Sequence, residues 1–130
     1  MSHHRETVHA EGAPPAAGPY SHAVISNGLV FVSGQVPIDP DTGKLVEGSI
    51  GDQTRRCLDN VAIVAAAAGA QLADAVRCGI YVTDISTFKD VNEAYGTYFP
   101  DAPPARSTIG VAALPLGAQV EIDAVLAVPD

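Results

Sequence analysis

Arg106 and Glu121 are the two residues whose types and positions best suit chemistry on a small molecule. Arg106 follows Pro103 and Pro104, which forbid a helix, and it precedes a run of β-forming residues. The chain has only seven Lys and Arg residues, so a cation behind such a rigid lead-in stands out. A guanidinium can hold a carboxylate through two parallel hydrogen bonds. Arg106 is therefore a candidate carboxylate anchor, and the alternative is a surface ion pair with an acid such as Asp101.

Glu121 lies inside an apolar segment, between Val120 and Ile122. Partial burial there would raise the pKa of its carboxyl group and suit it to proton transfer near neutral pH. The alternative is an ordinary exposed glutamate on a strand. Asp123 shares the strand face of Glu121 and could equally be the functional acid.

Weaker candidates lie near these two residues or at turns. Thr108 is two residues beyond Arg106 on the same strand face and adds a hydroxyl group. Tyr20 sits in a rigid Gly-Pro-Tyr-Ser turn that could present its phenol to a pocket, although a lone tyrosine there could simply pack. Ser33 and Gly34 place a hydroxyl and a bare backbone at a strand end, where a ligand can approach closely.

Other catalytic and metal-binding patterns are missing. The sequence has no nucleotide-binding loop, no HExxH and no GxSxG. His22 is the only histidine well inside the expected fold, and nothing places a serine nucleophile beside it. We expect no metal and no cofactor, because the remaining histidines and the cysteines match no ligand spacing and the thiols suit burial in a cytoplasmic protein. These residues are His3, His4, His9, Cys57 and Cys78.

Composition limits the class of protein. The 130 residues suit one domain, residues 1–130. Charged residues make up 17% and hydrophobic residues 47%, which favours a subunit interface and a homo-oligomer. A net charge of −8 disfavours nucleic acid as a partner. There is no apolar run long enough for a membrane span and no secretory signal, so we expect a cytoplasmic protein.

The expected elements alternate in the order β-β-β-α-β-α-β-β. Asn27-Gly28 predicts a hairpin, and Ser49 or Asp52 and Gly69 predict the ends of the first helix. The short connection 115–118 predicts an antiparallel pair for the last two strands. The expected ranges are a strand near 7–9, strands 22–26 and 29–33, a helix at 52–68, a strand at 76–83, a helix at 87–99, and strands 106–114 and 119–128.

These elements predict an α+β fold with two helices on one face of a mixed sheet. Val76, Cys78, Ile80 and Val82 are expected on one buried face, and the aromatic residues of the second helix in the core rather than in a ligand site. These aromatic residues are Phe88, Tyr95 and Tyr98. Apolar positions on both sides of the sheet favour a partner subunit as the cover of the open face.

Several short motifs occur in a fixed order along nearly the whole chain. They are Gly18-Pro19-Tyr20-Ser21, Val32-Ser33-Gly34-Gln35, Gln53-Thr54-Arg55 with Leu58-Asp59-Asn60, Tyr81-Val82-Thr83-Asp84, Val91-Asn92, Pro104-Ala105-Arg106-Ser107-Thr108 and Val120-Glu121-Ile122. With this set the sequence resembles the RidA family, also called YjgF or L-PSP, of imine and enamine deaminases.

The resemblance implies a chorismate-mutase-like fold and a homotrimer whose sheets form a central barrel, with sites in the clefts between subunits. It implies hydrolysis of reactive 2-imino acids, such as 2-iminobutanoate or 2-iminopropanoate, to 2-keto acids and ammonia. It also implies that Arg106 holds the substrate carboxylate and that Glu121 orients or activates water. Pocket positions would belong to Tyr20, Ser33, Gly34, Asn92 and Thr108.

Two departures from the family pattern bear on the substrate. Thr108 stands where many members carry Cys, and His22 stands where Gln is common. Alternatives therefore stay open: a relative acting on a pathway-specific enamine of the aminoacrylate or aminomuconate type, or a module that binds a small molecule without catalysis. A ribonuclease or translation inhibitor is disfavoured by the charge of −8 and by the lack of a histidine pair.

Overall fold

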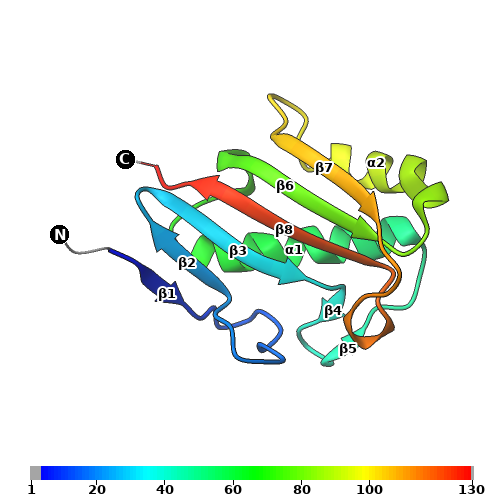
Figure 1. Ribbon diagram of the computed structural model, residues 1–130, viewed down its shortest axis with the longest axis horizontal. Helices are drawn as coiled ribbons and strands as arrows, with labels where there is room; N and C mark the ends of the chain where they lie inside the picture. Colours follow the sequence, from blue (N-terminus) through cyan, green and yellow to red (C-terminus); the bar gives the residue numbers. More distant parts are fainter. Residues whose placement is uncertain (1–3, 130) are drawn as a thin grey trace.

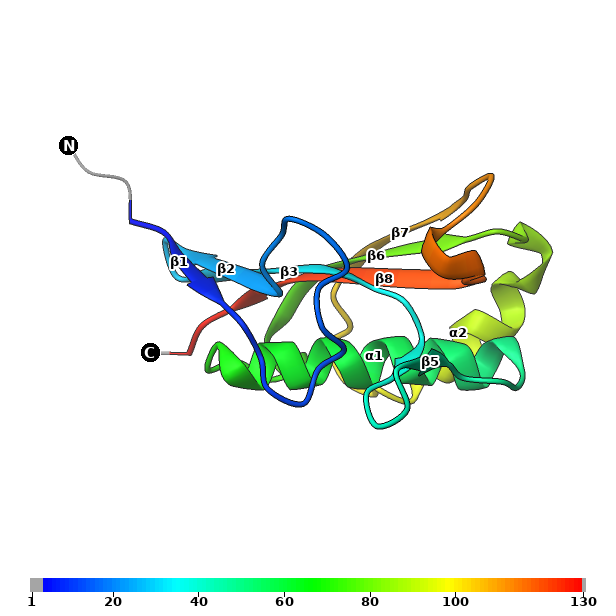
Figure 2. The same cartoon turned by 90° about the horizontal axis from the view of Figure 1, so that it is seen from below.

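The computed structural model describes residues 4–129 as a six-stranded mixed sheet with two helices packed on one of its faces (Figures 1 and 2). This is the expected α+β arrangement. The strands lie in the order β1-β2-β3-β8-β6-β7, and a separate two-stranded sheet pairs β4 with β5. The bounds are β1 Glu6–Val8, β2 Ala23–Ser26, β3 Leu29–Gln35, β4 Ile38–Asp39, β5 Lys44–Leu45, α1 Ile50–Ala67, β6 Ala75–Val82, α2 Phe88–Gly96, β7 Ala105–Gly110 and β8 Val120–Ala127.

Local signals give the turns and helix ends that the sequence predicts. Asn27 and Gly28 have φ values of 52° and 75°, as the hairpin between β2 and β3 requires. The Ser49 hydroxyl accepts a hydrogen bond from the N–H of Asp52, whose carboxylate accepts one from the N–H of Ser49. This reciprocal pair begins α1. Gly69, at φ 85°, directly follows the helix cap.

Strand β8 is the centre of the sheet and divides its residues cleanly between two faces. Val120, Ile122, Ala124 and Leu126 are buried against the helices, and the residues between them are partly exposed. The alternation predicted for this strand is therefore confirmed. Glu121 and Asp123 consequently lie on the face that the helices leave open.

The prediction that the last two strands pair with each other is wrong. Strand β8 runs antiparallel to β3 and β6, and β7 lies at the sheet edge, parallel to β6. β7 ends at Gly110, not at residue 114, so the connection to β8 is longer than the sequence reading allowed. That length lets the chain cross the end of β6 before it enters β8.

One residue of the predicted buried face of β6 is misplaced. Val76 is 46% exposed, because the register against β8 shifts between Ala75 and Arg77 and leaves Val76 without a partner. Such a bulge inserts one extra residue and reverses the alternation on its N-terminal side. Cys78, Ile80 and Val82 are fully buried, as predicted.

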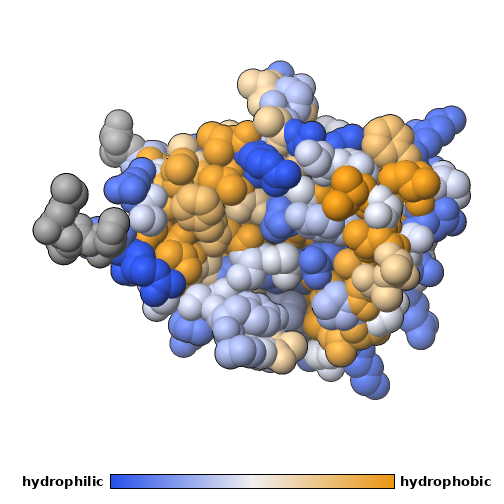
Figure 3. Space-filling view, in the orientation of Figure 1, coloured by the Kyte–Doolittle hydropathy of each residue, from blue (hydrophilic) through white to orange (hydrophobic). Residues whose placement is uncertain are grey.

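The open sheet face carries a large apolar patch. Figure 3 shows apolar side chains gathered over β2, β3 and β8 in the orientation of Figure 1, in which α1 and α2 lie behind the sheet. Phe31, 45% exposed, is flanked across the sheet by Val24 and Val125. Within residues 4–129 no helix combines the length and apolar character that a bilayer crossing requires.

Candidate functional site

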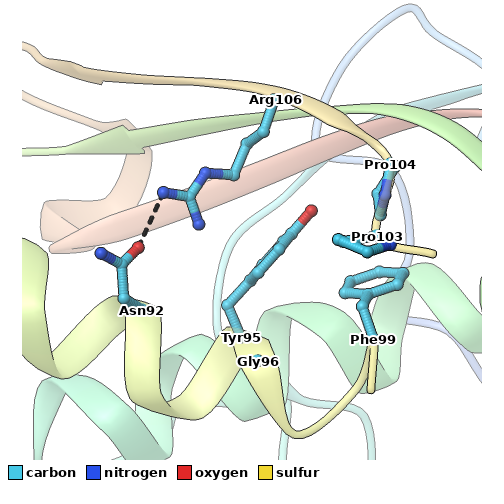
Figure 4. Close-up of a pocket in the computed structure, with 7 residues that line it drawn as sticks. All are labelled: Asn92, Tyr95, Gly96, Phe99, Pro103, Pro104 and Arg106. Carbon is cyan, nitrogen blue, oxygen red and sulfur yellow. Dashed lines mark hydrogen bonds between the residues drawn. The ribbon is translucent and has the colours of Figure 1, made fainter. Parts of the chain in front are cut away.

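Arg106 projects from the edge strand β7 toward α2 and is fixed there by Asn92. Its Nη2 donates a hydrogen bond of 2.7 Å to the Asn92 side-chain oxygen (Figure 4). The Arg106 guanidinium carbon lies 4.8 Å from the Tyr95 ring centroid and 5.6 Å from that of Phe88. An aromatic face attracts a guanidinium and holds its plane. The cation is therefore oriented before any ligand arrives.

The aromatic residues of α2 do more than fill the core. Tyr95 is 5% exposed and packs beside Phe99, yet it also supports the Arg106 guanidinium and lines its cavity. Phe88 is 43% exposed, so its assignment to the core is wrong. Spacing alone could not separate these roles, since the helix face that meets the core also borders the edge strand.

A cavity of about 380 Å³ opens beside the guanidinium, and Pro103 and Pro104 form one of its walls. Figure 4 shows Tyr95, from α2, between the guanidinium and the prolines, and Phe99, from the turn after α2, directly beneath Pro103. The alternative of an ion pair with Asp101 is not realised: in the described part of the chain no carboxylate lies within 4.0 Å of Arg106. A fixed cation facing a cavity can bind a small anion, above all a carboxylate.

Thr108 shares the helix-facing side of β7 with Arg106, as the alternation of exposure along the strand shows. Its hydroxyl is buried and has no hydrogen-bond partner among the described residues, and the same holds for the Tyr95 hydroxyl. Burial, together with the neighbouring Cys78 thiol, raises the pKa of Tyr95. Tyr95 therefore stays protonated at neutral pH.

Glu121 lies over Gly34 of β3 on the open face. A Cβ atom on Gly34 would come within 2.7 Å of the Glu121 Oε2, so any larger residue would displace the carboxylate from this position. The β3 register shifts between Val32 and Gln35, which places Gly34 in an irregular stretch. Burial, and secondarily the charge of Asp123, raises the pKa of the Glu121 carboxyl. Both effects favour a group that exchanges protons nearer neutral pH.

Tyr20 and Ser33 lie beside Glu121 on the same side of the sheet. They line, with Gly34 and Pro115, a cavity of about 260 Å³ next to the carboxylate. The Tyr20 hydroxyl accepts a hydrogen bond from the N–H of Ala17, and Ser33 Oγ donates to the carbonyl of Ser21. Both hydroxyl groups are thereby oriented by the backbone of the loop before β2.

His22 is a structural clamp for that loop. It is 6% exposed, its Nδ1 accepts from the N–H of Ala10, and its Nε2 lies 2.9 Å from the carbonyl of Pro14. Such a pair of contacts fits the neutral tautomer with the proton on Nε2. In the described part of the chain no three His, Cys, Asp and Glu side chains are grouped to hold a metal. His3 lies outside it.

Comparison with known proteins places the chain in a family. The family model described as Endoribonuclease L-PSP matches residues 10–128. Reactive Intermediate Deaminase A, chloroplastic, of Arabidopsis thaliana is 47% identical over 121 residues, which cover 93% of this chain and 65% of that protein. The chain belongs to the RidA/YjgF/L-PSP family.

Solved structures of related proteins agree in sequence and fold. A yeast protein, YEO7_yeast, is 43% identical and superposes with a TM-score of 0.94 over 97% of this chain and all of that one. Escherichia coli TdcF, solved with bound serine, is 34% identical with a TM-score of 0.89, covering 94% of this chain and 98% of that one. The RidA-type resemblance read from the sequence is confirmed.

In this RidA-family chain the predicted site residues form two separate groups. The first group lies between β7 and α2 and contains Arg106, Asn92 and Thr108. The second lies on the open face, at the ends of β3 and β8. It contains Tyr20, Ser33, Gly34 and Glu121. Glu121 does not line the cavity beside Arg106, and Arg106 lines neither of the two cavities beside Glu121.

Proposed function

We propose that this protein hydrolyses reactive 2-imino acids and their enamine tautomers to 2-keto acids and ammonia. The observation that carries the proposal is the Arg106 guanidinium, which Asn92 and the Tyr95 ring hold beside a cavity and which has no carboxylate partner within residues 4–129. The naming of a 47% identical relative as a reactive intermediate deaminase supports it. The bound serine named for the TdcF structure is also a carboxylate ligand.

The proposed reaction needs an anchor, a water and a proton acceptor. Arg106 holds the carboxylate of the imino acid, R–C(=NH)–COO⁻. Glu121 takes a proton from a water molecule as its oxygen bonds to the imine carbon, and the C=N electron pair moves to nitrogen. The proton then passes to that nitrogen, which gives a carbinolamine, R–C(OH)(NH₂)–COO⁻. Glu121 next takes the hydroxyl proton and passes it to the amino nitrogen as the C=O bond forms and the C–N bond breaks, so ammonia leaves with R–C(=O)–COO⁻. Holding the reactants in place can supply several kcal/mol of the barrier reduction.

We further propose that the site is completed by a second copy of the chain, within a homotrimer. The open face of the sheet carries Phe31, Val24 and Val125, an apolar surface that a second sheet can cover. Strand β7, which contains Arg106, forms one edge of the described sheet. An assembly that covers this face could bring the Arg106 group of one copy against the Glu121 group of another.

The test is ammonia release from 2-iminobutanoate and 2-iminopropanoate generated in situ by an amino-acid oxidase. Wild-type protein is expected to accelerate release over buffer, and Arg106→Ala to abolish the acceleration. Arg106→Lys keeps the charge but loses the bidentate fork, so it is expected to keep a small fraction of the rate. Arg55→Ala, which removes an exposed arginine of α1, is the matched control and should react like wild type.

The same assay separates the other functions. A folded wild-type protein that binds 2-oxobutanoate but accelerates no imine hydrolysis would be a binding module. Activity only on a larger enamine would indicate a pathway-specific relative. The family model carries the name of an endoribonuclease, but a net charge of −8 repels RNA. RNA cleavage that Arg106→Ala abolishes would reverse that choice.

A further inference from the structure

Asp123 is the second carboxylate on the open face of β8 and is held more firmly than Glu121. Its Oδ1 accepts a hydrogen bond of 3.0 Å from the N–H of Gly79, and its Oδ2 accepts one of 2.9 Å from the Tyr81 hydroxyl. Arg77 Nη1 lies 3.8 Å from Oδ1, and this arginine is 47% exposed. Water therefore screens the Arg77 charge, so Arg77 cancels little of the electrostatic effect that the Asp123 carboxylate has on its neighbours.

Each strand that flanks β8 has a glycine where one of the two carboxylates lies against it. A Cβ atom on Gly79 of β6 would lie 2.5 Å from the Asp123 Oδ1, just as one on Gly34 of β3 would strike Glu121. Each acid thus fills a notch made by a glycine on a neighbouring strand. Two residues apart on one strand face, Glu121 and Asp123 lie about 7 Å from each other.

We propose that Asp123 is a positioning residue that acts through Glu121: its carboxylate, held by Gly79 and Tyr81 on the same strand face, places a negative charge that helps Glu121 to take up and return a proton. The inference rests on the proposed deaminase function for its catalytic meaning. The arrangement of charges itself does not depend on any substrate. If solvent and Arg77 screened its charge fully, replacing Asp123 by asparagine would leave the titration of Glu121 unchanged.

Other titratable groups face Glu121 from the surrounding elements, and none of them replaces Asp123. Strand β3 places Gly34 against the carboxylate and the Ser33 hydroxyl beside it, and Tyr81 stands opposite Glu121 across the β6–β8 register. The loop before β2 contributes a phenol and a histidine already paired with backbone atoms, and α1 contributes a buried thiol beneath the sheet. These groups are Tyr20, His22 and Cys57.

The experiment is a titration of the Glu121 side-chain carboxyl by ¹³C NMR in the full chain. In Asp123→Asn the pKa of Glu121 is expected to fall by roughly 0.5 of a unit or more, from the loss of one charge about 7 Å away. Asparagine keeps an acceptor for Gly79 and a polar partner for Tyr81. Asp101→Asn removes an exposed charge in the turn before β7 and should leave the pKa of Glu121 unchanged.

Tyr81→Phe separates charge from hydrogen bonding, because it removes one bond to Asp123 but keeps the carboxylate. It should lower the pKa of Glu121 far less than Asp123→Asn does. An unchanged Glu121 pKa in Asp123→Asn, or an equal fall in Tyr81→Phe, would overturn the proposal. Should Asp123→Asn fail to fold by circular dichroism, Asp123→Ser is titrated under the same criteria.

The activity measurement keeps this inference distinct from the proposed function. If wild-type protein hydrolyses imines, the limb of the pH–rate profile that Glu121→Gln removes should move to lower pH in Asp123→Asn by the shift seen in NMR. The affinity for 2-oxobutanoate, which Arg106 anchors, should stay the same. If wild-type protein hydrolysed no imine, the proposed deaminase function would be refuted. The change in the Glu121 pKa measured by NMR would still test the electrostatic coupling between Glu121 and Asp123.

Discussion

Mixing two inactive variants should restore activity, because Arg106 and Glu121 of one chain are too far apart to share a substrate. Arg106 is level with Cys78 of β6, which is level with Ala124 of β8. Two strand spacings separate β7 from β8, and three residues separate Ala124 from Glu121. The two backbone positions are thus about 14 Å apart. Moreover, Arg106 points to the helices and Glu121 to the open face.

A 2-imino acid cannot bridge that gap. Its carboxylate carbon is bonded directly to the imine carbon, so the guanidinium and the water-activating carboxylate must lie within about 7 Å of each other. In a cyclic trimer each site would combine Arg106 of one copy with Glu121 of the next. A trimer mixed from Arg106→Ala and Glu121→Gln chains has one junction where both residues are intact, so about one third of wild-type activity should return.

The assay uses two affinity tags. The two variants are co-expressed with different tags, mixed oligomers are isolated over both resins, and imine hydrolysis is measured per site. A dimer would restore about one half, so the recovered fraction also reports the oligomeric state. Doubly tagged oligomers of Arg106→Ala alone are the control. Mixed oligomers that co-purify but stay inactive would refute the split site.

Three further variants test the local geometry. Gly34→Ala should displace the Glu121 carboxylate and lower kcat/KM about 100-fold while circular dichroism stays unchanged; a wild-type rate would show that the notch is not needed. Thr108→Val should raise the free energy of unfolding by about 1 kcal/mol in urea, since the lost hydroxyl is buried without a partner in the described residues; destabilisation would indicate a partner from a second copy. Asn60→Ala should lower the free energy of unfolding by about 2 kcal/mol, because the buried Asn60 side-chain amide donates to the carbonyls of Val36 and Ile38. An unchanged free energy of unfolding would mean that water replaces the amide.

Features coded by neighbouring residues could be predicted from the sequence. The Asn27-Gly28 turn, the Ser49 cap and the two faces of β8 depend on a handful of adjacent side chains, and each is confirmed. The two prolines before Arg106 likewise predicted a rigid segment at the start of its strand. The structure places Pro103 and Pro104 in the wall of the Arg106 cavity.

Features that depend on distant partners could not be predicted in this way. No residue near Val76 in the sequence indicates the bulge, which arises from the register of β6 against β8. The role of Tyr95 follows from the arrival of β7 beside α2. Only the strand–helix–strand order of β6, α2 and β7 carried a usable signal, since such units commonly join parallel neighbours.

The observed strand order also restricts how two copies could form the proposed site. In a hairpin turning at residues 115–118, Arg106 would lie opposite Ala127 and therefore on the same sheet face as Glu121. With β6 between them, the register instead places Arg106 level with Ala124, on the helix-facing side. A flat stack of open faces could not then reach the guanidinium. In the proposed trimer we therefore expect the neighbouring copy to approach from the β7 edge, beside the Arg106 cavity, while its own open face supplies the carboxylate.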